Sequence, residues 1–185
     1  MQHKFSKLVL SAMFLALALL LPFLTGQIPQ IGSMLLPMHL PIMLCGLICG
    51  WKYGAMTGFI APLLRFMLFS MPPLLTAVPM AFELAAYGAV LGFLYERSKW
   101  KCVVSLYRSL FAAMIFGRII WGVVRVLLTG VAQSPFTWQI FISGAFLTAI
   151  PGIILQLILI PTIMIALNKT KVVKFSKHKT DAVKQ

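Results

Sequence analysis

The sequence predicts an all-α integral membrane protein, with six transmembrane helices in one bundle and both termini in the cytoplasm. Of its 185 residues, 61% are hydrophobic, and the mean hydropathy is +0.97, whereas a soluble domain has about 45–50% apolar residues. Several apolar runs approach the roughly 20 residues that cross a bilayer. Both termini and the even-numbered connections are basic, while the odd-numbered connections carry no charge, as the positive-inside rule requires of this topology.

The length leaves room for one domain. Six spans with short connections fill residues 1–167, which we expect to form the transmembrane domain. Residues 168–185 are polar, rich in lysine and without a periodic apolar face, so we expect a disordered cytoplasmic tail.

The net charge of +13 would suggest a nucleic-acid partner in a soluble protein. Here the basic residues lie mostly in the flanks and connections, which is typical of cytoplasmic loops beside a lipid bilayer, so we expect no nucleic-acid partner. The three cysteines, Cys45, Cys49 and Cys102, lack CxxC spacing, and we interpret them as structural rather than as metal ligands.

The first predicted helix occupies residues 1–25. Lys4 and Lys7 precede an apolar run, as in a signal peptide, but a small-x-small cleavage site is missing and further apolar segments follow. Ala12 and Ala16 lie on one face of this helix, where small residues let another helix approach closely.

The second helix follows an uncharged outer loop at residues 25–37. It is predicted from His39, or from Leu36 if the loop is tucked in, to Gly50. The twelve residues from His39 to Gly50 rise only about 18 Å, which is short of a ~30 Å hydrocarbon core. We therefore expect that this helix does not cross the lipid alone.

A tight turn at residues 51–53 is predicted to lead into the third helix, which ends near Phe69. Through this hairpin glycine recurs at every fourth position, which permits close packing of helix backbones. These residues are Gly46, Gly50, Gly54 and Gly58.

Three longer helices complete the predicted bundle. The fourth spans residues 76–95, and a basic connection at residues 96–108 leads to the fifth, which extends to about Thr129. After an uncharged loop at residues 130–139, the sixth is predicted from about residue 142 to residue 167.

Several ionisable side chains fall within the predicted membrane helices. His39 stands at the outer start of the second helix, Arg65 and Arg125 lie about one turn inside the outer face, and Glu83 and Arg118 lie nearer the middle. A charge in mid-bilayer costs about 3 kcal/mol even on the mildest scale, so such residues are expected to face a partner or a cavity.

Helical spacing groups these side chains with other polar residues on shared faces. The groups are Glu83 with Tyr87 on the fourth helix, Arg118 with Trp121 and Arg125 on the fifth, and Gln156 in a stripe of small and polar residues on the sixth. Three polar faces imply a polar interior.

Structural roles compete with a binding role for these residues. Glu83 can form an ion pair with Arg65 or with Arg118 that only holds helices together. Arg65 and Arg125 can also extend to headgroup phosphates, and His39 can hydrogen-bond its own loop. However, three intramembrane arginines face one glutamate, and such an excess of positive charge suits an anionic or carboxylated ligand.

The composition argues against an enzyme. The chain has three acidic residues, and Glu96 and Asp181 fall in predicted cytoplasmic segments, so no carboxylate pair or acidic metal cluster can form inside. GxSxG, HExxH and phosphate-loop motifs are absent. We therefore predict no catalytic residue, metal or cofactor, and active transport would need energy from another subunit.

Two segments carry a resemblance to a known family. They read PMHLPIMLCGLICGWKYGAMTGFIAPLLR and MAFELAAYGAVLGFLYE, and they cover the second to fourth helices. With the six short spans, the alanine pair and the uncharged first outer loop, they resemble the substrate-binding S components of bacterial energy-coupling-factor (ECF) vitamin transporters.

The resemblance implies a bundle in the bacterial cytoplasmic membrane that captures a vitamin or vitamin precursor from outside. Such proteins work with a transmembrane coupling subunit and two cytoplasmic ATPase subunits, and they topple in the membrane to release the ligand inward. In the family an alanine motif of the first helix contacts the coupling subunit, and Ala12 and Ala16 match that motif.

Substrate contacts in the family come from outer loops and from the outer parts of the later helices. By position, the resemblance places Gln27, Gln30, Glu83, Trp121, Arg125 and Gln139 near the ligand. The polar residues of the interior add four further candidates for substrate binding, which are His39, Arg65, Tyr87 and Gln156.

The charge argument favours an acid such as pantothenate over a neutral vitamin such as riboflavin. The tryptophan-rich signature of thiamine binders is absent. The alternative function is a non-transporting membrane scaffold or assembly protein, in which the buried ion pairs are purely structural.

Overall fold

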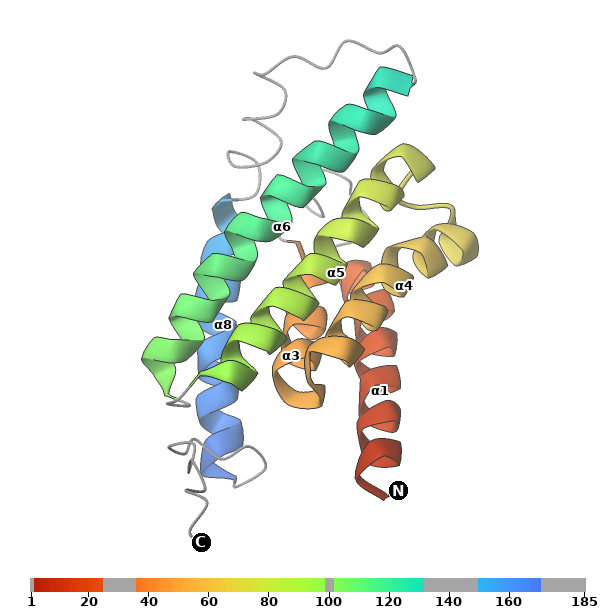
Figure 1. Ribbon diagram of the computed structural model, residues 1–185. Coiled ribbons are helices and arrows are strands. Elements are labelled where there is room, and N and C mark those ends of the chain that lie inside the picture. The colour runs from red at the N-terminus through yellow and green to blue at the C-terminus, as the bar shows by residue number, and fades with distance from the viewer. Residues whose placement is uncertain (1, 25–35, 99–101, 132–149, 171–185) are drawn as a thin grey trace, which may run out of the picture.

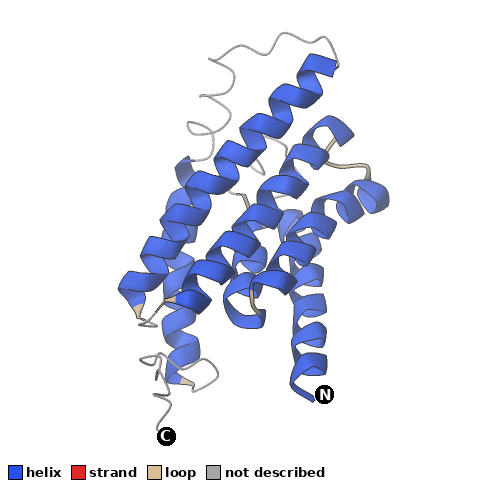
Figure 2. Ribbon diagram, in the orientation of Figure 1, coloured by secondary structure: helices blue, strands red, loops and turns tan. Residues whose placement is uncertain are grey.

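The computed structural model describes residues 2–24, 36–98, 102–131 and 150–170, and within these ranges all regular secondary structure is helical (Figure 2). The helices are α1 (Gln2–Leu24), α3 (His39–Cys49), α4 (Trp51–Phe69), α5 (Leu74–Arg97), α6 (Val103–Val131) and α8 (Ile150–Lys169). Four of the described helices, α1, α5, α6 and α8, are long and apolar enough to cross a membrane. The predicted all-helical membrane fold is confirmed at this level.

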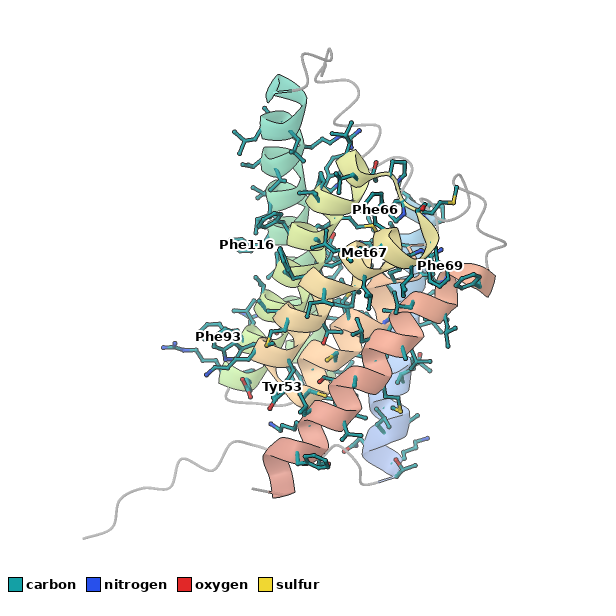
Figure 3. All side chains as sticks on the ribbon, turned by 90° about the vertical axis from the view of Figure 1, so that its right-hand side faces the viewer. Tyr53, Phe66, Met67, Phe69, Phe93 and Phe116 are labelled. Atoms are coloured by element: carbon teal, nitrogen blue, oxygen red, sulfur yellow. The ribbon has the colours of Figure 1, made fainter. Side chains whose placement is uncertain are left out.

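Helix α5 lies at the centre of the bundle. It packs against α4 on one side, α6 on the other, and α3 behind, while α1 covers α3 and α4 (Figure 1). Helix α8 packs more lightly, against α6 and α3. Phe93 of α5 and Phe116 of α6 project outward from this bundle, with exposed fractions of 44% and 55%, as expected for side chains that meet lipid (Figure 3).

Glycines bring the backbones of α3, α4 and α5 into direct contact. A Cβ at Gly46 would lie 2.5 Å from the Gly88 carbonyl oxygen, and one at Gly54 would lie 2.6 Å from Gly46 Cα. A Cβ at Gly58 would meet the carbonyl of Leu84. We call Gly46, Gly54, Gly58, Gly88 and Gly92 the glycine seam, and it confirms the predicted close packing through the hairpin.

The prediction of a turn at residues 51–53 was wrong. Gly50 alone makes the turn, with a φ of 104° that side-chain-bearing residues rarely adopt. Because one residue reverses the chain, Trp51 can begin α4 directly, and its indole is 39% exposed. The interfacial character of this segment therefore belongs to the first turn of a helix.

Two other helix boundaries differ from the prediction. Pro73 precedes α5, and the helix begins at Leu74 rather than at residue 76. Helix α6 begins at Val103, so Arg108 lies inside it and not in the connection. A long basic side chain near a helix end can extend to the membrane surface and does not stop the helix. Residues 142–149, predicted to begin the sixth helix, lie outside the described residues.

The two ends of the bundle differ in charge. Several helix ends lie at one end of the bundle (Figure 1). They are the start of α1, the turn between α3 and α4, the end of α5, the start of α6 and the end of α8. We call this the basic end, because it carries Lys7, Lys52, Arg97, Arg108 and Lys169. At the opposite end, the charged residues within the described helices are Arg65 and Arg125.

Candidate functional site

A cluster of polar side chains is buried where α3, α5 and α6 meet. Glu83 of α5 is 2% exposed, and its Oε1 lies 3.1 Å from Arg118 Nη1 of α6 and 3.8 Å from His39 Nε2 of α3. Tyr87 donates its hydroxyl proton to the same Oε1 at 3.0 Å. We call these four residues the Glu83 cluster; of the two arginines considered as partners of Glu83, the structure selects Arg118.

Local helix geometry explains the arrangement within α5 and α6. Glu83 and Tyr87 are four residues apart and so lie on one face, as predicted. The Tyr87 ring fits against α6 because position 117 is glycine: a Cβ there would lie 2.5 Å from Tyr87 Cε1. Gly117, next to Arg118 in α6, therefore leaves room for the Tyr87 ring, whose hydroxyl reaches Glu83.

His39 lies deeper than its predicted place at the outer rim. It is the first residue of α3 and is 1% exposed, and its contact with Glu83, nine residues into α5, puts it roughly 13 Å below the start of α5. Leu36 and Met38, which precede it, are buried too. Helix α3 therefore starts inside the bundle and runs to the basic end.

Arg118 is bound to Glu83 through only one of its three nitrogens. Its Nε and Nη2 are buried and have no hydrogen-bond partner among the described residues. These two atoms form one edge of the guanidinium, and such an edge can hold a carboxylate through two parallel hydrogen bonds. Both ring nitrogens of His39 also lack a hydrogen-bond partner in the described part of the chain.

The start of α3 adds a second feature that suits an anion. The first N–H groups of a helix carry a partial positive charge, and no side chain caps this helix at Met38. In membrane proteins, helices that begin within the bilayer often direct this end toward an anionic substrate group. Here the helix start lies beside Glu83 and therefore in the same polar cluster.

Arg65 was predicted as a site residue, and the structure places it away from the Glu83 cluster. It is 4% exposed, and its Nη1 donates to the carbonyl oxygen of Leu19 in α1 at 2.9 Å. Its guanidinium lies 5.3 Å from the ring centre of Phe23 and 5.7 Å from that of Phe69. Arg65 therefore fastens α4 to α1 and does not extend outward to a headgroup.

The other predicted site residues are distributed over α6 and α8. Arg125 donates from Nη1 to the carbonyl oxygen of Leu75 at 2.8 Å, near the start of α5, and Trp121 is half-buried on the same helix. Gln156 of α8 is 2% exposed, and its Nε2 has no partner among the described residues. Gln27, Gln30 and Gln139 lie outside the described residues.

Arg118 is the residue that the sequence prediction left out of the binding set. Its position near the middle of a long apolar helix was the available signal, and the sequence analysis counted it in the excess of positive charge without naming it as a binding residue. Gly117 gave no signal in the sequence, because its role depends on where the Tyr87 ring lies in space.

Ala12 and Ala16 lie on the exposed face of α1, whereas Ser11, Phe14 and Ala18 face the bundle. Large apolar side chains surround the pair: Val9 is 55% exposed, Met13 51% and Leu17 40%. This face of α1 is available to lipid or to another membrane helix.

A family model described as "ECF transporter, substrate-specific component" matches residues 6–164, which is most of the chain. The comparisons with curated proteins and with solved structures found no match.

Proposed function

Because the chain belongs to the family of substrate-specific components of ECF transporters, we propose that it captures a small carboxylated vitamin or vitamin precursor, of the type of pantothenate. The capture site in this proposal is the Glu83 cluster, with Arg118 as the residue that holds the carboxylate.

The observation that carries the proposal is the unpaired edge of Arg118. A buried guanidinium with two nitrogens that lack a partner among the described residues is costly, since each unpaired buried donor costs about 1–3 kcal/mol and more when charged. Glu83 holds Nη1 at 3.1 Å and so fixes the direction in which Nε and Nη2 point. A ligand carboxylate would satisfy both atoms, and the nearby start of α3 would add favourable electrostatics.

The charges of the cluster can accommodate an anion. Arg118 and Glu83 together are neutral, so a ligand carboxylate adds one negative charge beside Glu83. His39 lies 3.8 Å from Glu83, and neither of its ring nitrogens has a hydrogen-bond partner among the described residues. An N–H of this imidazole can therefore donate a hydrogen bond to the ligand carboxylate.

The family supplies the rest of the proposal. ECF S components act with the ECF module, and we propose that the exposed Ala12–Ala16 face of α1 contacts its transmembrane coupling subunit, with two cytoplasmic ATPases driving release. The charge of the basic end supports its placement in the cytoplasm of a bacterial cell, with six spans and both termini inside.

The experiment is mass spectrometry of small molecules released from the gently purified full-length chain. Arg118→Lys keeps a positive charge for Glu83 but removes the two-nitrogen edge. Arg65→Lys is the matched control, because it makes the same change at another buried arginine. We expect one carboxylated molecule at near-stoichiometric amount in the unaltered chain and in the control, and at least about tenfold less in Arg118→Lys.

The other outcomes separate the alternatives. Equal amounts of bound ligand in Arg118→Lys and Arg65→Lys would refute the role of Arg118. Recovery of a neutral vitamin such as riboflavin would refute the preference for an acid. The Glu83–Arg118 ion pair also fits a membrane scaffold whose charges only join helices. That function would be favoured by a chain with no retained ligand and no thermal stabilisation by any of a panel of vitamins.

A further inference from the structure

A second polar site lies at the basic end, away from the Glu83 cluster. The end of α5 and the start of α6 border an open cavity of about 720 Å³. Its polar lining consists of Arg97, Ser98, Cys102, Ser105, Arg108 and Ser109. The proposed transport function uses none of these residues.

The described residues that line the cavity give it a positive charge. Arg97 and Arg108 are exposed at its mouth, and none of the described residues that line it is acidic. Glu96 precedes Arg97 in the chain but faces the turn between α3 and α4, where its Oε1 would lie 3.3 Å from a Cβ at Gly50. Two arginines without a carboxylate favour an anionic ligand with several acceptor oxygens.

Hydroxyl groups line the interior of the same cavity. Ser109 is 4% exposed and lines the cavity. Ser105 donates its hydroxyl proton to Ser98 Oγ at 2.5 Å. A serine hydroxyl on the wall of a basic cavity can donate a hydrogen bond to an anion bound there.

The position of the cavity indicates which anion it meets. Two candidate membrane spans meet here, one ending at Arg97 and one starting at Val103, so we expect the cavity to lie near the level of the lipid headgroups. Phe93 is 44% exposed, and the Arg97 guanidinium lies 5.8 Å from its ring centre, which is a pairing suited to the membrane interface. Basic pockets between membrane helices on the cytoplasmic side bind anionic headgroups.

We propose that this cavity is a phosphate-binding site that holds the headgroup phosphate of an anionic phospholipid. Arg97 and Arg108 contact the phosphate oxygens, and Ser109 donates its hydroxyl to the phosphate from inside. A bound lipid would join the ends of α5 and α6 at the membrane surface. The site is independent of the ligand that the Glu83 cluster binds.

Native mass spectrometry of the full-length chain tests this proposal, with an equimolar mixture of phosphatidylglycerol and phosphatidylcholine as the probe. The measured quantity is the ratio of the two bound lipids. We expect Arg97→Gln and Arg108→Gln each to lower the ratio roughly fivefold, the effect of one basic residue near an anionic headgroup. Ser109→Ala should lower it about twofold, the effect of one lost hydrogen bond.

Lys52→Gln is the matched control, because Lys52 is an exposed basic residue at the same end but outside the cavity. Because Lys52 does not line the cavity, the ratio in this control should fall less than it does in Arg97→Gln and Arg108→Gln. A loss in this control equal to that of the arginine variants would show attraction by general surface charge and would overturn the site. An unchanged ratio in all variants would overturn it as well.

A second arm distinguishes the lipid from free phosphate. Inorganic phosphate is added at constant ionic strength, and the bound phosphatidylglycerol is measured again. Retention of the lipid supports the proposal. Displacement by inorganic phosphate would refute the assignment to a lipid and assign the cavity to a soluble phosphate compound.

Discussion

Glu83 receives contacts from side chains on three helices at one carboxylate oxygen. A carboxylate in this position would be costly without Arg118, and a guanidinium without Glu83 would be equally so. The spacing of Glu83 and Tyr87 was predictable because helical periodicity relates them. The choice of Arg118 over Arg65 was not, because it depends on how α4 and α6 are rotated about their axes.

Removal of the carboxylate tests the structural strength of the pair. Glu83→Gln should lower the free energy of unfolding by about 3–5 kcal/mol, because it leaves Arg118 buried without an anion. Thermal unfolding of the detergent-solubilised protein measures the change. Glu96→Gln, which alters an exposed glutamate of the same helix, should change stability by less than about 0.5 kcal/mol. Similar effects in both variants would show that the pair does not stabilise the fold.

Within α5, Tyr87 gives a finer test of the same cluster. Tyr87→Phe removes one hydrogen bond to Glu83 and keeps the ring that packs against Gly117. We expect a loss of about 1 kcal/mol in the free energy of unfolding. Tyr95→Phe is the control, because its buried hydroxyl has no partner among the described residues, and it should be neutral or stabilising. A larger loss of stability in Tyr95→Phe than in Tyr87→Phe would contradict the hydrogen bond between Tyr87 and Glu83.

At the scale of elements, the glycine seam fixes α3, α4 and α5 as one packed unit. The four-residue spacing predicted this contact in the hairpin, but it could not identify Gly88 and Gly92 as the opposing surface, since that pairing joins segments distant in sequence. The predicted turn at residues 51–53 failed for a related reason: a single positive-φ glycine makes a shorter turn than interfacial composition suggests.

The seam leaves no space for a methyl group. Gly88→Ala should lower the free energy of unfolding by about 1–3 kcal/mol or more, because its Cβ would meet the backbone of Gly54. The matched control is Ala89→Val, which adds volume at the next, half-buried position of α5. If thermal unfolding shows equal losses, the close approach of α4 and α5 is not what makes glycine necessary.

At the scale of the whole molecule, the charge pattern predicted which helix ends share one side of the membrane, and Figure 1 shows these ends together at the basic end. The sequence could not predict that α3 begins at the depth of Glu83, because that depth is set by the buried approach of Leu36 and Met38. Nor could it reveal the cavity at the start of α6, which depends on the helix beginning at Val103.

The proposed docking role of the exposed alanine face of α1 is tested by measuring ligand retention and cellular uptake separately. Ala12→Leu and Ala16→Leu should leave ligand retention unchanged and abolish uptake into cells, because bulky side chains prevent close approach of a partner helix. Val123→Leu adds volume to an exposed position of α6 and should affect neither measurement. Loss of ligand retention in the alanine variants would count against a docking role.

The ion pair between α5 and α6 has a consequence for biogenesis. Glu83 is synthesised 35 residues before Arg118, so α5 reaches the translocon while its counterion is still in the ribosome. An uncompensated carboxylate at the centre of a span raises the free energy of insertion by about 2.5–3.5 kcal/mol. Stable integration of α5 should therefore wait for α6, and the two helices should enter the lipid as a hairpin.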